Sequence, residues 1–211
     1  MIENIETTNI LIVISSPSGA GKTSICKKLL ELDGKIRPSI SVTTRKPRNN
    51  ETNGIDYIFI SNHDFDKKVL DGEFLEYANV FSNKYGTLAS STNDLLDKDY
   101  DVLFDIDWQG TQQLSQKNSN ILTIFILPPD KIEIERRLKK RETENSENID
   151  IVIERMSKFE DELSHWKEYD YVVTNDDFDK CMSEILNIIT VERKKRTRQK
   201  SLFTKIRDLT E

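Results

Sequence analysis

A short apolar run followed at once by a glycine-rich turn constrains the fold of this chain more than any other feature. Residues 10–14 (Ile-Leu-Ile-Val-Ile) are continuously apolar and mostly β-branched, which predicts a strand buried in a parallel sheet. Residues 16–23 (Ser-Pro-Ser-Gly-Ala-Gly-Lys-Thr) form the turn, and a helical pattern with Cys26, Leu29 and Leu30 on its inner face follows. A strand, a glycine-rich turn and a helix in this order are typical of a phosphate-binding loop.

Each residue type in this turn has a chemical reason to bind phosphate. Gly19 and Gly21 can adopt the unusual backbone angles that point successive N–H groups at an anion. Lys22 adds a positive charge at the β- and γ-phosphate oxygens, and the Thr23 hydroxyl can ligate Mg²⁺. The alternative is a chance pair of glycines, but the chain has only 7 glycines and two of them stand at the required offsets. We expect nucleotide phosphates to bind along Ser16, Pro17, Ser18, Gly19, Ala20, Gly21, Lys22 and Thr23.

The length and charge of the chain limit the remaining choices. With 211 residues the chain can bury one substantial core with inserted subdomains. The net charge of −6 disfavours wholesale binding to a nucleic-acid backbone. One basic run, residues 193–200, could touch RNA or a membrane surface, but a solvated end of a C-terminal helix is the preferred interpretation. We therefore expect neither nucleic acid nor a membrane among the partners.

Three further features favour a cytoplasmic protein. The 2 cysteines, Cys26 and Cys181, stand in no metal-binding spacing and suit a reducing compartment better than a disulfide framework. The first residues are acidic and lack the layout of a signal peptide. No apolar run reaches the roughly 20 residues that span a bilayer.

Strands and helices alternate along most of the chain. Further buried strands are predicted over residues 101–107, 121–127 and 171–174, with a short helix at 109–116 and a longer one at about 177–193. This order predicts an α/β fold of three layers, in which helices cover both faces of a parallel sheet. We assign residues 9–41, 91–135 and 156–211 to this phosphate-loop core.

Two segments interrupt the alternation. Residues 42–90 are polar, rich in turns and aromatic, which predicts an inserted α+β subdomain with antiparallel strands at 57–60 and 74–77. Between these strands, Ser61 and Asp64 predict the capped start of a helix that ends near Gly72. Residues 136–155 are highly charged and predict a helical lid, two helical arms around an apolar-free loop at 142–148.

A pair of arginines in the first insertion predicts a second phosphate site. Residues 41–48 (Ser-Val-Thr-Thr-Arg-Lys-Pro-Arg) place Arg45 and Arg48 around a proline, and Tyr57 follows in Asn-Gly-Ile-Asp-Tyr. Arginine binds a phosphate dianion through two parallel hydrogen bonds, and a tyrosine hydroxyl supplies a further donor. An exposed basic turn is the alternative, but the proline and glycine around these residues favour a shaped loop.

At this point the chain resembles the guanylate kinases. The resemblance covers about residues 10–191, and its motifs occur in the family's order. They are the Ser-x-Thr-Thr-Arg-x-Pro-Arg-x-x-Glu segment from Ser41 to Glu51, Asn-Gly-x-Asp-Tyr at Tyr57, Glu-Phe-x-Glu at Glu76, Tyr-Gly-Thr at Thr87, and Asp-Ile-Asp-x-Gln-Gly from Asp105.

The resemblance implies a GMP site in the first insertion. Its phosphate would be held by Arg45, Arg48, Tyr57 and Tyr85, with Glu51 also in the site. Glu76 would accept hydrogen bonds from N1–H and the 2-amino group of guanine, a pattern that adenine cannot match. The base pocket would be completed by Ser41, Thr87 and Asp107.

The resemblance also implies the ATP side of a phosphotransferase. Arginines of the lid would close over the triphosphate, at Arg137, Arg141 and Arg155, and the catalytic set would add Lys22 and Arg45. Asn175 would line the adenine site. Mg²⁺ would be ligated by Thr23 and held through water by Asp105. Positioning and charge neutralisation would carry the rate, and no general base is required because the GMP phosphate is already a nucleophile.

Three functions compete for this sequence. The first is a guanylate kinase that converts ATP and GMP (or dGMP) to ADP and GDP, as a monomer or a homodimer. The second is a catalytically inactive guanylate-kinase-like binding module, which would lack the phosphate loop or the lid arginines. The third is another phosphate-loop enzyme, such as a different nucleoside monophosphate kinase or a GTPase, but the Asn-Lys-x-Asp guanine reader of GTPases is absent from the sequence.

Overall fold

The computed structural model describes residues 9–48, 51–80, 82–118, 120–145, 149–199 and 201–211. Side chains are not described for residues 140–145, 149–152, 154–155 and 201–205. The predicted lid arginines Arg141 and Arg155 fall in these ranges, so their side-chain positions lie outside what the structure describes.

The core is a parallel sheet whose central strand is β1 (Leu11–Ser15). β1 pairs with β7 (Asp101–Asp105) on one side and β8 (Ile121–Leu127) on the other. β2 (Ile36–Pro38) and β9 (Tyr171–Thr174) complete the order β2-β7-β1-β8-β9, and every pairing is parallel. The predicted parallel sheet is therefore confirmed.

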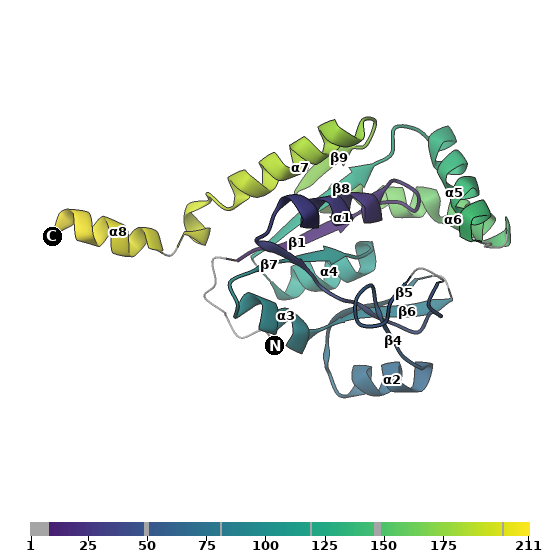
Figure 1. Ribbon diagram of the computed structural model, residues 1–211, viewed down its shortest axis with the longest axis horizontal. Coiled ribbons are helices and arrows are strands. Elements are labelled where there is room, and N and C mark those ends of the chain that lie inside the picture. The colour runs from purple at the N-terminus through teal and green to yellow at the C-terminus, as the bar shows by residue number, and fades with distance from the viewer. Residues whose placement is uncertain (1–8, 49–50, 81, 119, 146–148, 200) are drawn as a thin grey trace.

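Helices cover both faces of this sheet, which explains why β1 is buried at every position and apolar from Leu11 to Ile14 (Figure 1). Ile12 and Ile14 face a core shared with α1 (Lys22–Leu32) and α7 (Phe178–Glu192). The alternate residues Leu11 and Val13 face a second core, which takes side chains from the two helices of the opposite face. These helices are α3 (Ala89–Leu96) and α4 (Trp108–Lys117).

A smaller sheet lies beside the core and is made from the first insertion. Its order is β4 (Ile58–Phe59), β3 (Val42–Thr43), β6 (Asn83–Leu88) and β5 (Phe74–Val80). The prediction of two antiparallel strands is wrong for β4, which runs parallel to β3, whereas β5 pairs antiparallel with β6. Strand pairing is a tertiary property, and α2 (Asn62–Leu70) carries the chain from β4 to β5 across the sheet instead of through a hairpin.

The helix between these strands begins as its capping signal predicts. The Ser61 hydroxyl accepts a hydrogen bond from the Asp64 N–H over 3.1 Å. Phe65 of α2 stacks on Phe74 of β5, with 4.7 Å between ring centroids, and both rings are buried with Val42. This contact fixes the helix on the small sheet.

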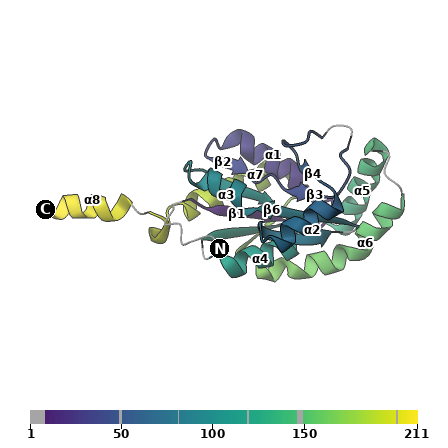
Figure 2. The same ribbon diagram turned by 90° about the horizontal axis from the view of Figure 1, so that it is seen from below.

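Two long helices, α5 (Lys131–Asn145) and α6 (Ile149–Ser164), form the second insertion and pack against each other (Figure 2). Ile134 and Leu138 of α5 and Phe159 of α6 reach the main core. The predicted loop at 142–148 is wrong as far as Asn145, because α5 continues through it. Glutamate favours a solvated helix even where no apolar residue anchors it. The rest of that loop, residues 146–148, lies outside the described residues.

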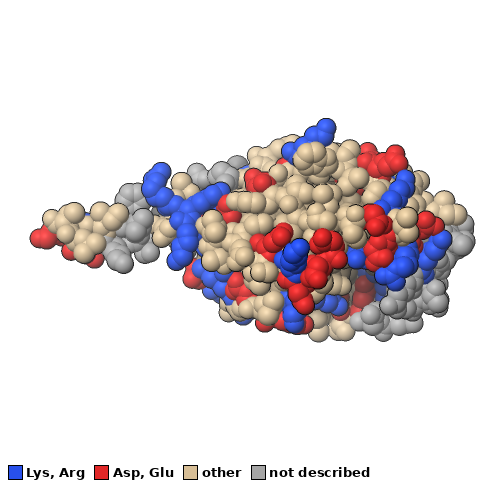
Figure 3. All heavy atoms as spheres, turned by 90° about the horizontal axis from the view of Figure 1, so that it is seen from above, with Lys and Arg blue, Asp and Glu red and all other residues tan. Residues whose placement is uncertain are grey.

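The prediction of a solvated helix end is only partly right for the described residues 193–199: residues 194–197 are exposed beyond α7, but two arginines are held by carboxylates. Arg193 pairs with Asp33 and with the buried Asp101, each at 2.7 Å. Arg198 is buried against the carboxylate of Glu192. Exposed Lys and Arg side chains of this run gather where α8 (Ser201–Thr210) leaves the body of the molecule (Figure 3). Among the described residues, no helix is long and apolar enough to cross a membrane.

Candidate active site

The glycine-rich turn lies at the carboxyl end of β1 and leads directly into α1. Gly19 and Gly21 have φ angles of 88° and 101°, values that side chains other than glycine rarely adopt. α1 begins at Lys22, and its cap, Gly21, has no side chain to occupy the first N–H groups of the helix. These N–H groups and the positive end of the helix are suited to bind phosphate.

Lys22 and Thr23 both reach the carboxylate at the end of the neighbouring strand β7. Lys22 Nζ lies 2.5 Å from Asp105 Oδ1 and donates to the Ile106 carbonyl, and the Thr23 hydroxyl lies 3.4 Å from Asp105 Oδ2. Burial would lower the pKa of Lys22, but Asp105 outweighs burial and raises it. Hydroxyl and carboxylate oxygens are the ligands that Mg²⁺ prefers, so Thr23 and Asp105 fit the predicted metal.

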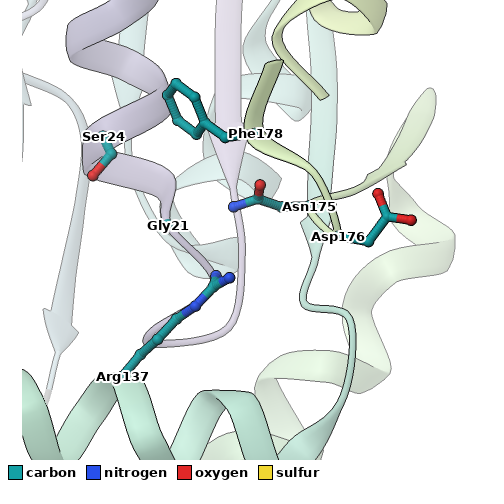
Figure 4. A pocket seen from close by; sticks show the side chains of 6 residues that line it. All are labelled: Gly21, Ser24, Arg137, Asn175, Asp176 and Phe178. Carbon is teal, nitrogen blue, oxygen red and sulfur yellow. The ribbon is translucent and has the colours of Figure 1, made fainter. Parts of the chain in front are cut away.

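A pocket of about 240 Å³ opens beside the phosphate loop (Figure 4). Figure 4 shows Arg137 of α5 and Asn175, which follows β9, converging on the loop. Both side chains donate to the Ala20 carbonyl, Asn175 at 2.8 Å and Arg137 at 3.4 Å. Sequence reasoning missed three lining residues, Ser24, Asp176 and Phe178. Asp176 and Phe178 follow Asn175 so closely that this segment could have been predicted as a wall of the pocket.

Arginines and aromatic rings of the first insertion meet at the predicted second phosphate site. The Arg45 guanidinium lies 5.2 Å from the centre of the Tyr57 ring, and the Tyr85 ring is 6.1 Å from that ring. Glu51 Oε1 pairs with Arg45 at 2.7 Å and with Arg48 at 3.6 Å. Burial would raise the pKa of Glu51, but the two arginines hold it below its usual range. Glu51 therefore orients both arginines in this structure.

A buried carboxyl group occupies the predicted base pocket. Glu76 of β5 is 2% exposed and faces Thr87 across the β5–β6 pairing. Glu76 Oε1 and the Thr87 hydroxyl make no hydrogen bond of regular geometry with the described residues, although Thr87 lies close enough to Glu76 to lower the pKa of its carboxyl group against the effect of burial. Burial raises the pKa of Glu76 to about 7. Buried polar atoms without partners are rare in folded proteins, and they mark a place where a ligand can bind.

Two other residues of the predicted base pocket have structural contacts. Ser41 is buried at the start of the small sheet, where its carbonyl accepts from the Ile58 N–H. Asp107 caps α4, because its Oδ1 accepts from the Gly110 N–H over 3.1 Å. Both residues lie on segments that also carry site residues, since Ser41 precedes the arginine loop and Asp107 follows Asp105.

The phosphate loop is also joined to the second insertion. The Ser18 N–H donates to Glu162 Oε2 of α6 over 2.9 Å. Burial raises the pKa of this carboxyl group. Sequence reasoning missed Glu162, because the contact joins residues 144 positions apart and no local pattern marks it.

The two phosphate sites lie close enough to influence each other. Burial is the largest cause that raises the pKa of Tyr57, and the charges of Asp105 and Lys22 act on the same hydroxyl. The Tyr57 hydroxyl of the arginine site therefore lies within the electrostatic reach of Lys22 and Asp105 at the phosphate loop.

Comparison with known proteins agrees with this geometry. A family model described as guanylate kinase matches residues 8–192. The chain belongs to the guanylate kinase family. The class of enzyme expected from the motifs, a nucleoside monophosphate kinase, is confirmed.

Named relatives and a solved structure support the assignment. A guanylate kinase of Zymomonas mobilis is 48% identical over 92% of this chain and 89% of its own length. A guanylate kinase of Rickettsia prowazekii is 48% identical over 88% of this chain and 93% of its own. The crystal structure of guanylate kinase from Anaplasma phagocytophilum has a TM-score of 0.76 and 34% identity, over 91% of this chain and 90% of that one.

Proposed function

We propose that this guanylate kinase transfers the γ-phosphoryl group of ATP to GMP or dGMP. The observation that carries the proposal is Glu76, a buried carboxyl group with an oxygen that no described residue satisfies. Guanine presents two donors on one edge, N1–H and the 2-amino group, and a carboxylate can accept both. Adenine presents an acceptor at N1, which would leave a buried charge unpaired.

In this proposal the acceptor is held by the first insertion and the donor by the phosphate loop. Arg45, Arg48, Tyr57 and Tyr85 bind the GMP phosphate, whose oxygen attacks the γ-phosphorus of ATP. The bond from the γ-phosphorus to the bridging oxygen breaks, so the products are GDP and ADP. Ser41, Thr87 and Asp107 line the base pocket, and Asn175 lies on the adenine side.

Charge neutralisation is the main contribution of the chain to the rate. Lys22 and the lid arginines Arg137, Arg141 and Arg155 would stabilise charge on the moving phosphoryl group and the bridging oxygen. Thr23 would bind Mg²⁺ directly and Asp105 through water, and the ion would neutralise charge on the β- and γ-phosphates.

We assign the motions of catalysis to three units. Residues 9–41, 91–135 and 156–211 form the core, 42–90 the GMP-binding subdomain, and 136–155 the lid. Closure of the last two over the core excludes water that would otherwise hydrolyse ATP. ATP and GMP are the partners proposed here. We assign the protein to the cytoplasm, as a monomer or a homodimer, without a nucleic acid or membrane partner.

A coupled assay of ADP release tests the proposed function. ATP and Mg²⁺ are supplied with GMP, dGMP, AMP, UMP or CMP in separate reactions. We expect turnover with the two guanine nucleotides and little with the others. A preference for any other base, or no transfer to GMP, overturns the proposal.

A further inference from the structure

Gly110 stands where the local structure gives no reason for a glycine. It is the third residue of α4, and its N–H donates to the capping carboxylate of Asp107. Its φ angle is not among the positive values found at Gly19, Gly21, Gly54 and Gly72. Glycine inside a helix is less favourable than alanine because it loses more backbone freedom on folding. An explanation must therefore come from what lies next to Gly110.

The neighbour is the carboxyl group of Glu76. A Cβ atom on Gly110 would lie 2.5 Å from Glu76 Oε2 and 3.2 Å from Glu76 Cδ. Real Cβ atoms do not approach other atoms so closely, so a methyl group here requires a shift. The Ile106 Cδ1 atom, at 3.2 Å, closes the space on another side.

Glu76 has little room to give way. Its side chain is 2% exposed, and β5, which carries it, packs against α4. With Oε2 against the first turn of α4, Oε1 is the oxygen left without a partner among the described residues. The positive end of the helix also favours a negative charge at this place.

We propose that Gly110 is a positioning residue for base recognition, because its missing side chain lets the Glu76 carboxylate lie against α4 and accept hydrogen bonds from guanine. The inference rests on the proposed function, which makes Glu76 the guanine reader. Gly110 does not touch the substrate in this account; it acts through Glu76. An alanine at this position displaces the carboxylate, and the binding of GMP weakens while the binding of ATP does not.

Steady-state kinetics of Gly110→Ala test the proposal. We expect the KM for GMP to rise about tenfold or more, with the KM for ATP unchanged and kcat at saturating GMP nearly kept. Ser115→Ala is the matched control, because Ser115 is an exposed residue of the same helix. Gly34→Ala is a second control, since a Cβ at Gly34 meets nothing within 4 Å. An unchanged KM for GMP in Gly110→Ala overturns the proposal.

A double-mutant cycle shows whether the effect passes through Glu76. Once Glu76→Ala has removed the carboxyl group, Gly110→Ala meets no clash, so the double variant should have the GMP KM of Glu76→Ala alone. If Gly110→Ala alone fails to fold, adding Glu76→Ala should restore the melting temperature of the protein. Effects that simply add in the cycle overturn the proposal.

The cycle also separates this proposal from the function on which it rests. If Glu76→Gln leaves the GMP KM unchanged, the assignment of Glu76 to guanine fails, and this proposal fails with it. If Glu76→Gln raises the GMP KM and Gly110→Ala does not, only the role of Gly110 is wrong.

Discussion

Burial of a carboxyl group with an unsatisfied oxygen destabilises a folded chain, and Glu76 is buried with Oε1 in no regular hydrogen bond among the described residues. An apolar residue would serve the stability of β5 better. In the proposed function two donors of guanine satisfy the carboxyl group, so Glu76 would favour substrate binding over folding. Because the pKa of Glu76 is about 7, its effects on stability and on GMP binding should both change within an accessible pH range.

The free protein should lose stability through Glu76 as pH rises. Its pKa in the folded chain is about 7, above the value of 4.5 for an exposed carboxyl group, so the folded state holds the proton more tightly. The contribution of protonated Glu76 to the free energy of unfolding is therefore fully present below about pH 4.5. It is lost as the pH rises through about 7, and the loss amounts to about 3 kcal/mol. Thermal unfolding of the wild type and Glu76→Gln across this range measures it. The same pH slope in both proteins contradicts the prediction.

Binding of GMP should show the opposite pH dependence. Guanine needs the ionised carboxylate, so the KM for GMP should rise as pH falls below about 7. The phosphate of GMP titrates near the same pH. In Glu76→Gln the titration of the phosphate still affects the KM, but the titration of the Glu76 carboxyl group is gone. We expect a raised GMP KM in Glu76→Gln and a weaker pH dependence than in the wild type. Equal profiles in the two proteins would falsify the role of Glu76 in the base pocket.

Lys22 should matter far more for turnover than for folding. Lys22→Ala removes the charge at the β- and γ-phosphates, and we expect kcat to fall by about 10²–10³-fold. The Lys22–Asp105 pair is partly solvent-exposed, so its loss should change the free energy of unfolding by no more than about 1 kcal/mol. Lys28→Ala, on the exposed side of α1, is the control. Urea unfolding and initial rates measure the two effects, and a variant with near-normal kcat rules out the proposed role.

At the scale of elements, the sequence predicts what is local and misses what is tertiary. β1, β7 and β8 were predictable because burial of both faces gives each of them a run of apolar residues. β2 was not, since Arg37 and Pro38 break the pattern in a strand of three residues at the edge of the sheet. The predicted antiparallel direction of β4 was wrong because a strand of two residues does not specify its partner.

The same division holds for the site. The phosphate loop and the arginine segment are continuous in sequence, and their motifs predicted them. Glu162 and the contact of Gly110 with Glu76 join distant elements, and no sequence pattern marks them. Arg193 was misread for this reason, because a basic run shows no sign of the buried Asp101 that it meets.

The end of α7 should be held to the core by Arg193. Arg193→Ala leaves the Asp101 carboxylate, which is 1% exposed, without its charged partner. Removal of one member of a buried pair is strongly destabilising, and we expect a loss of about 3 kcal/mol in the free energy of unfolding. Arg196→Ala, on the exposed part of the same run, should change it by less than about 0.5 kcal/mol. Equal effects of the two substitutions in urea unfolding contradict the prediction.

At the scale of the whole molecule, both insertions lie at the end of the parallel sheet where its strands have their carboxyl ends (Figure 1). The Ser18–Glu162 contact joins the phosphate loop to α6, and Arg137 reaches the loop from α5. Helices α5 and α6 therefore contact the loop that we propose as the donor site. The proposed acceptor site lies mainly on the small sheet, so we expect binding of both substrates to bring separate parts of the chain together.

Closure should be visible as a loss of size in solution. We expect the radius of gyration from small-angle X-ray scattering to fall when GMP and a non-hydrolysable ATP analogue bind together. GMP alone should give a smaller change, because the residues proposed to hold it lie mainly in 42–90 and none lies in the lid. Arg137→Ala keeps the helices and removes one contact to the donor side, so it should close less completely. No compaction of the wild type with both ligands means that the lid assignment is wrong.

The central position of β1 has a consequence for how the chain is made. β1 leaves the ribosome before its neighbours β7 and β8, and the Ile10 N–H donates to Asp101 across 91 positions of sequence. A contact between such distant segments forms slowly, because a long loop must close first. During synthesis the apolar residues of β1 must stay unpaired until β7 and β8, at residues 101–127, have emerged. The apolar segment of β1 is therefore exposed to aggregation until its partner strands are made.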